Sequence, residues 1–150
     1  MFLINLGVTL YRSKKWNPIT AILFGGMIGL AVMYMFDMVF FKSLVEDYYW
    51  WWWIIHLWVE GAWELIATAI MAFLLVRLTG IPKEKLYKWL YLEVSLVLFT
   101  GILGIGHHYY WIGTPGYWLT VGAIFSALEP IPILIMAIDE IGRASCRERV

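Results

Sequence analysis

Six of the ionisable side chains inside apolar stretches of the chain are the residues most able to do chemistry. They are His56, Glu60, Glu64, His107, His108 and Glu129. A charged side chain in hydrocarbon costs at least about 2.5 kcal/mol on insertion scales, so such residues usually face a functional interior. Imidazole nitrogens suit copper, zinc or iron, and an added carboxylate oxygen favours iron. The three histidines together with Glu60 therefore predict a metal site.

The spacing of these residues predicts that the histidines lie at one depth in the membrane. His56, Glu60 and Glu64 recur every four residues, so a helix places them on one face. In helices over 50–78 and 87–111, His56 and His107 each lie outward of the helix centre by about 12 Å at the α-helical rise. Because adjacent helices run antiparallel, both histidines lie toward the same membrane face. Glu64 and Glu129 are expected near the midplane.

The composition indicates a membrane protein. Of 150 residues, 62% are hydrophobic and 15% are charged, a balance that a water-soluble domain of this size would not have. Ten Trp, nine Tyr and eight Phe suggest aromatic belts at the two interfaces of a lipid bilayer. With Cys146 as its single cysteine, the sequence has no disulfide framework and no thiolate metal cluster. No nucleic-acid partner is expected.

The apolar runs predict an all-α membrane protein, a polytopic transmembrane helix bundle with four full spans after a partial helix at residues 1–11. The spans are expected at about 18–41, 50–78, 87–111 and 118–138, and they form one domain, 1–138. Asn17 and Pro18 provide a helix start, and the GTPGY segment at 113–117 provides a turn. The partial helix is too short to cross a bilayer, so it is expected to be the end of a longer helix.

Residues 139–150 differ in character from the spans before them. They offer little apolar surface that a helix bundle would bury. Their last part, GRASCRERV, resembles an adaptor or a vector readthrough, so it is expected to be non-native and Cys146 is given no role. Finding this segment encoded at the source locus would contradict that expectation.

The distribution of Lys and Arg predicts the orientation in the membrane. On the side of the N-terminus lie Arg12, Lys14, Lys15, Arg77, Lys83, Lys85 and Lys88. On the opposite side Lys42 stands alone. By the positive-inside rule the N-terminal side is cytoplasmic, which places the predicted metal site in the periplasmic half.

Three motifs resemble one protein family. HLWVEGAWELI at 56–66, GHHYYWIGTPGYW at 106–118 and FSALEPIP at 125–132 closely resemble the catalytic subunit of bacterial nitric oxide reductases, within the haem-copper oxidase superfamily. The resemblance extends from roughly Trp16 to Ile138. Oxygen reductases of one major class have a tyrosine four residues after the first metal histidine and bind copper. Glu60 stands there in this chain, as in the nitric oxide reductases.

The resemblance implies a role for each of the six residues. His56, His107, His108 and Glu60 would ligate a non-haem iron. Glu64 and Glu129 would assist proton delivery and stabilise charge at the site. A structural hydrogen bond for Glu64, and a simple proline kink at Glu129, are the alternatives.

The implied reaction is the reduction of two NO molecules to nitrous oxide and water. It would take place between the non-haem iron and a high-spin haem b, with electrons arriving through a low-spin haem b. Trp63-Glu64 and Glu129-Pro130 look more like the form that receives electrons from a cytochrome c-type small subunit than the single-chain form that oxidises quinol. The implied location is the bacterial cytoplasmic (inner) membrane, with protons entering from the periplasm.

The chain departs from the family in what it lacks. Once His56, His107 and His108 are assigned to iron, no histidine remains for either haem, and the family has about twelve spans. The chain is therefore expected to be a fragment that supplies the iron ligands and is inactive alone. Two rivals remain: an oxygen-reductase fragment, which should carry tyrosine at position 60, and a non-catalytic membrane transporter of metal ions or protons.

Other features of the spans are expected to be structural. The run Trp50 to Trp53 is expected to form an interfacial belt. Glu93 is expected to reach outward to Lys88 or Arg77. Close helix packing is expected from two groups of glycines, Gly25, Gly26 and Gly29 in the first span and Gly101, Gly104 and Gly106 beside His107.

Overall fold

The computed structural model of the chain describes residues 1–147, and only the backbone of residue 140 and of residues 143–147. Every element in this part is a helix, and four helical runs are long and apolar enough to cross a membrane, which confirms the predicted fold class. In chain order the elements are α1 (Phe2–Ser13), α2 (Pro18–Phe36), α3 (Leu44–Leu57), η1 (Trp58–Trp63), α4 (Glu64–Thr79), α5 (Lys83–Leu103), η2 (Gly104–Tyr109), α6 (Gly116–Leu128) and α7 (Pro130–Arg147).

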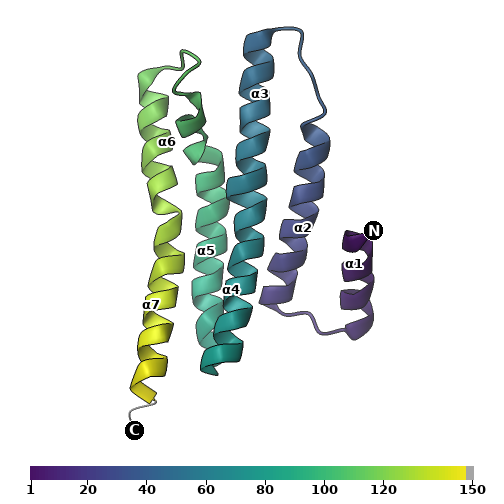
Figure 1. Cartoon of the computed structure of the whole chain (residues 1–150), viewed down its shortest axis with the longest axis vertical. Coiled ribbons are helices and arrows are strands. Elements are labelled where there is room, and N and C mark those ends of the chain that lie inside the picture. Colours follow the sequence, from purple (N-terminus) through teal and green to yellow (C-terminus); the bar gives the residue numbers. More distant parts are fainter. Residues whose placement is uncertain (148–150) are drawn as a thin grey trace.

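The second span forms the centre of the bundle. It is one helical run, α3–η1–α4, from Leu44 to Thr79. Helix α5 and then α6–α7 lie on one side of it, α2 lies on the other, and α1 packs beside α2 at the edge (Figure 1). In the most apolar 18-residue stretch of α2 only 11% of the residues are buried, whereas the corresponding share in the central span is 39%. Most of the α2 surface is therefore free to meet lipid or another part of a larger protein.

Local hydrogen bonds explain where the first two spans begin and end. The Asn17 side chain accepts from the Thr20 N–H and the Thr20 hydroxyl accepts from the Asn17 N–H, both at 3.1 Å, which confirms the predicted start of α2. Helix α2 ends at Phe36 and does not continue to residue 41, because the Phe41 N–H donates instead to the Asp47 carboxylate at 2.9 Å. Helix α3 begins at Leu44, earlier than expected, because Ser43 caps it.

The fourth span is broken where the sequence predicts a kink. Helix α6 ends at Leu128 and α7 begins at Pro130, because the prolines at 130 and 132 have no N–H to continue the α-helical ladder. Helix α7 then continues to Arg147, past the predicted end at 138. The predicted tail, 139–150, lies partly outside the described residues, and its non-native origin stays a prediction.

The main apolar core lies at the end of the bundle away from the histidines. It joins the start of α2, the end of α4, the start of α5 and the middle of α7 through Ile19, Ala69, Ala72, Leu75, Ile81, Leu86, Leu90 and Met136. Four helices are held together there by apolar contact. The other half of the bundle can therefore carry polar residues in its interior.

Candidate metal centre

His56 and Glu60 occupy the point where the central helix changes its geometry. His56 lies in the last turn of α3, and Glu60 lies in η1, a π-helical turn. Such wide turns are rare inside α-helices and occur frequently at functional sites. The Nδ1 atom of His56 lies 3.2 Å from Oε2 of Glu60. The pairing expected from their four-residue spacing is therefore present.

Helix α2 packs closely against this π-turn. A Cβ atom added at Gly26 would lie 2.8 Å from Cγ1 of Ile66 and 3.0 Å from the carbonyl oxygen of Ala62. The indole N–H of Trp58 donates to the Leu30 carbonyl at 3.2 Å, which joins η1 to α2 a second time. The close approach predicted for the glycines of the first span is confirmed at Gly26.

His107 and His108 lie in η2, a 3₁₀ turn, and not in the α-helix predicted to run to residue 111. A 3₁₀ helix rises about 2.0 Å per residue against about 1.5 Å in an α-helix, so His107 lies slightly further along the helix axis than the α-helical count predicts. Packing against α6 accompanies the change. A Cβ added at Gly122 would lie 2.5 Å from the backbone nitrogen of His107, so the two segments meet without side chains between them.

The π-turn and the 3₁₀ turn together bring four ligand groups to one place. The Nε2 atoms of His107 and His108 lie 3.2 Å and 3.5 Å from Oε1 of Glu60. One donor atom from each of His56, Glu60, His107 and His108 lies within 4.8 Å of all the others. Nitrogen and oxygen ligands bound at about 2.1 Å to one ion stand at most about 4.2 Å apart, so a small contraction would let all four bind a single metal.

The polar atoms of this cluster also fit a shared cation. Within the described residues, His56 Nδ1, Glu60 Oε2 and His108 Nε2 are buried and have no hydrogen-bond partner, although oxygen and nitrogen lie close together. A buried polar atom without a partner is costly, and one metal ion would satisfy all three. The His56 side chain is fully buried, while 21% of Glu60 and 23% of His107 is exposed. One side of the cluster is therefore open to a small ligand.

Trp52 is a residue of this site that the sequence did not reveal. Its ring stacks on the ring of His108, with centroids 4.9 Å apart and planes inclined by 18°. The neighbouring Trp50 donates its indole N–H to the Phe36 carbonyl at 3.0 Å. Trp50 and Trp52 therefore make contacts that the predicted interfacial belt did not include. The four-residue spacing from Trp52 to His56 was the available signal, because it places both on one helical face.

Two tyrosines tie the 3₁₀ turn to α3. The hydroxyl of Tyr109 donates to the Tyr49 carbonyl at 3.1 Å, and the hydroxyls of Tyr49 and Thr114 lie 2.7 Å apart. The two tyrosine rings also pack, with centroids 4.7 Å apart. These contacts fix the segment after His108 against the start of the central span.

The two other predicted site carboxylates lie outside the four-ligand group. Glu129, at the break between α6 and α7, is buried, and its Oε1 atom lies 3.3 Å from where a Cβ of Gly104 would stand. Glu64, in the first turn of α4, is half-buried. Among the described residues, Oε2 of Glu64 and Oε1 of Glu129 have no hydrogen-bond partner. The structure therefore offers no helix-to-helix hydrogen bond for either of these two oxygens.

The prediction for Glu93 was wrong. Its exposed fraction is 3%, so the side chain does not reach outward to Lys88 or Arg77. Its carboxylate instead lies at the backbone of Ile133, in the first turn of α7. First-turn N–H groups of a helix are available to an acceptor, particularly where prolines interrupt the helix before them. The contact between α5 and α7 therefore decides where Glu93 points.

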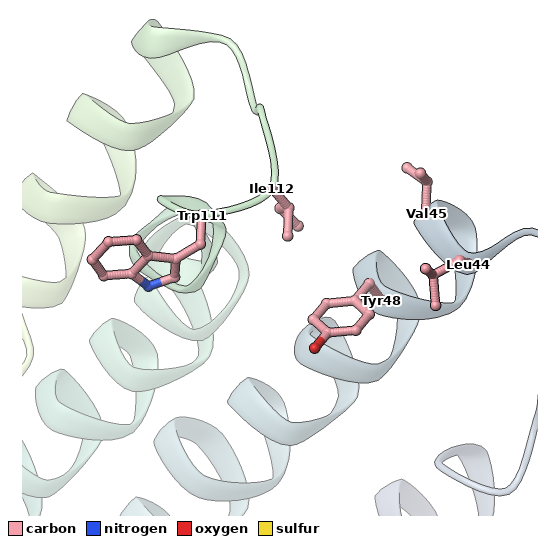
Figure 2. A pocket seen from close by; sticks show the side chains of 5 residues that line it. All are labelled: Leu44, Val45, Tyr48, Trp111 and Ile112. Atoms are coloured by element: carbon pink, nitrogen blue, oxygen red, sulfur yellow. The ribbon is translucent and has the colours of Figure 1, made fainter.

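A groove elsewhere on the bundle has no side chain that commonly binds a metal ion. It has a volume of about 450 Å³ and lies between the start of α3 and the segment after η2 (Figure 2). It is lined by Leu44, Val45, Tyr48, Trp111 and Ile112. None of these side chains offers an imidazole, a thiol or a carboxylate. The histidine cluster is therefore the candidate centre for metal chemistry.

Comparison with known proteins supports the resemblance seen in the motifs. The profile of the family described as cytochrome c and quinol oxidase polypeptide I matches residues 1–146. A nitric oxide reductase subunit of Stutzerimonas stutzeri is 44% identical over 148 residues, which make up 99% of this chain and 31% of that protein. The chain thus spans less than a third of the length of the curated relative it matches.

Proposed function

The chain belongs to the cytochrome c and quinol oxidase polypeptide I family, and from this premise we propose that it is a segment of the catalytic subunit of a nitric oxide reductase. In this proposal the segment supplies the ligands of a non-haem iron. The observation that carries it is Glu60, whose carboxylate oxygens lie 3.2 to 3.5 Å from nitrogens of His56, His107 and His108. The Stutzerimonas stutzeri relative, a nitric oxide reductase subunit at 44% identity, supports the choice within the family.

Each of the four residues has a part in holding the metal. His56, His107 and His108 would each offer one imidazole nitrogen, and Glu60 would offer a carboxylate oxygen. The negative charge of Glu60 lowers the net charge of the site and suits iron better than copper. A bound iron would supply Lewis-acid and redox chemistry for joining two NO molecules. The partial exposure of Glu60 and His107 is consistent with access of a diatomic ligand to that side.

The carboxylates beside the cluster would handle protons. Glu64 follows Glu60 by one turn of the central span, and Glu129 lies behind Gly104. Carboxyl groups in a membrane interior generally face a functional path or one another. In this proposal they hold protons for the reduction, and the protons enter from the periplasm by a short route.

The remaining parts of the reaction would come from outside this segment. A low-spin and a high-spin haem b would be bound by other spans of the intact subunit. The electron donor would be a cytochrome c-type small subunit, or quinol in a single-chain form. The protein would lie in the bacterial inner membrane with the N-terminal side of this segment in the cytoplasm, an orientation supported by its seven Lys and Arg against Lys42.

The test is purification of the full-length protein encoded by the same gene. We expect non-haem iron in addition to haem, and conversion of NO to nitrous oxide when the reduced protein is exposed to NO. Copper in place of the non-haem iron, with oxygen consumption, would favour an oxygen reductase. A full-length protein without haem would favour a metal or proton transporter. Proton uptake that is obligatorily cytoplasmic would overturn the periplasmic route alone.

A further inference from the structure

We propose that Glu129 is the positioning residue of His56, and that its carboxylate holds the second imidazole nitrogen of His56 through one water molecule seated at Gly104. This inference rests on the proposed metal site. It assigns to Glu129 a task in orienting a ligand, in addition to the proton handling suggested above.

The orientation of His56 leaves its Nε2 atom without a hydrogen-bond partner among the described residues. Its Nδ1 atom faces Glu60 at 3.2 Å, so Nδ1 is the atom that joins the ligand cluster. The Nε2 atom therefore points away from the cluster. A histidine that binds metal through one nitrogen normally carries its proton on the other and donates it to a carboxylate, a carbonyl or a water. Among the described residues, Nε2 of His56 has no hydrogen-bond partner, and His56 is fully buried.

Glu129 offers the acceptor that this nitrogen lacks. Its side chain is 6% exposed, and its Oε1 atom is buried and likewise has no hydrogen-bond partner within the described residues. Both atoms border one point. The position of a Cβ on Gly104 lies 3.3 Å from Oε1 of Glu129 and 3.5 Å from Nε2 of His56. A donor, Nε2–H of His56, and an acceptor, Oε1 of Glu129, thus both lie beside Gly104 without a hydrogen-bond partner.

In this proposal one water molecule joins the two atoms. The two atoms have no direct hydrogen bond, yet both lie near the same point. A buried water needs at least two polar partners, and here it would accept from Nε2–H and donate to the carboxylate. A side chain at position 104 would occupy this place. The break at Pro130 fixes the backbone from which Glu129 extends, so the kink delivers the carboxylate to His56.

The inference is tested in the full-length, haem-containing protein with three variants. Gly104→Ala places a methyl group in the shared space with a close but tolerable fit, Glu129→Leu removes the acceptor, and Glu129→Gln keeps an acceptor oxygen without the charge. Gly25→Ala is the matched control, because a Cβ there meets nothing within 4 Å. The readouts are the rate at which a chelator removes non-haem iron and the Mössbauer spectrum of that iron. The haem absorption spectrum reports whether each variant has assembled.

We expect Gly104→Ala and Glu129→Leu to lose iron about 10- to 100-fold faster than the parent, as when other groups that hydrogen-bond to metal-bound histidines are removed. The Mössbauer quadrupole splitting of the non-haem iron should also change in these two variants. Glu129→Gln should release iron at a rate between those of the parent and Glu129→Leu. Gly25→Ala should match the parent in both readouts. Iron release and spectra equal to the parent in both Glu129 variants would overturn the inference, even if Gly104→Ala fails to assemble. A parent protein without non-haem iron would instead overturn the proposed function.

Discussion

The indole of Trp52 lies almost parallel to the imidazole of His108, with ring centroids 4.9 Å apart. One residue comes from the start of the central span and the other from the 3₁₀ turn at the end of the third span. The stack therefore fixes the plane of a proposed metal ligand across two segments that are distant in the sequence.

Replacing Trp52 should weaken metal binding without unfolding the bundle. Aromatic pairs contribute about 0.5 to 1.5 kcal/mol beyond area burial, so Trp52→Leu should lower iron affinity by up to about tenfold. Chelator competition on the full-length protein measures this. Trp111→Leu is the control, because Trp111 is 89% exposed. Equal iron affinity in the two variants would show that the stack does not orient His108.

Removing the charge of Glu60 should have a larger effect. Glu60→Gln keeps the shape of the side chain but removes its negative charge. The proposed iron ion would then have three neutral imidazoles and no carboxylate as ligands. Truncating one partner of a buried charge pair typically costs about 3 to 5 kcal/mol, so iron affinity should fall at least about 100-fold. The iron-to-haem ratio after purification is the measurement. Glu46→Gln, at an exposed position in the first turn of α3, is the control. Full iron occupancy in Glu60→Gln would remove Glu60 from the ligand set.

Crowding the contact between α2 and the π-turn should destabilise the protein. In Gly26→Ala the new Cβ would meet Ile66 at 2.8 Å and the Ala62 carbonyl at 3.0 Å, and backbone cannot move aside cheaply. Overpacking of this kind costs about 1 to 3 kcal/mol, so the midpoint of thermal unfolding in detergent should fall. Gly25→Ala, with open space around it, should leave the midpoint unchanged or raise it. A stable Gly26→Ala protein would mean that α2 sits further from the π-turn.

A methyl group at Gly122 should displace His107. Its Cβ would lie 2.5 Å from both the His107 nitrogen and the Gly106 Cα, so α6 and η2 would have to separate. We expect Gly122→Ala to lose both thermal stability and non-haem iron. Gly116→Ala, at the start of the same helix and with nothing within 4 Å, is the comparison. Loss of stability with full retention of iron would show that His107 is not held by this contact.

The amino-acid sequence by itself determined the membrane-spanning helices and the four residues that form the ligand cluster. Hydropathy and helical periodicity are local properties, so they placed the four spans and put His56 and Glu60 on one face. The depth of each histidine along its span, together with the antiparallel order of adjacent spans, was enough to predict that His107 and His108 lie beside them. The cap at Asn17 and the break at Pro130 also follow from residues next to them in the chain.

Only the tertiary structure decided how the helices pack around the ligand cluster. The π-turn at Glu60 lies against the glycine face of α2, and the 3₁₀ turn at His107 lies against Gly122 of α6. The stack of Trp52 on His108, the burial of Glu93 and the approach of Glu129 to Gly104 likewise join segments far apart in the chain. The periodicity of one helix shows which residues share a face. It does not show which neighbour that face meets, because packing between helices sets that.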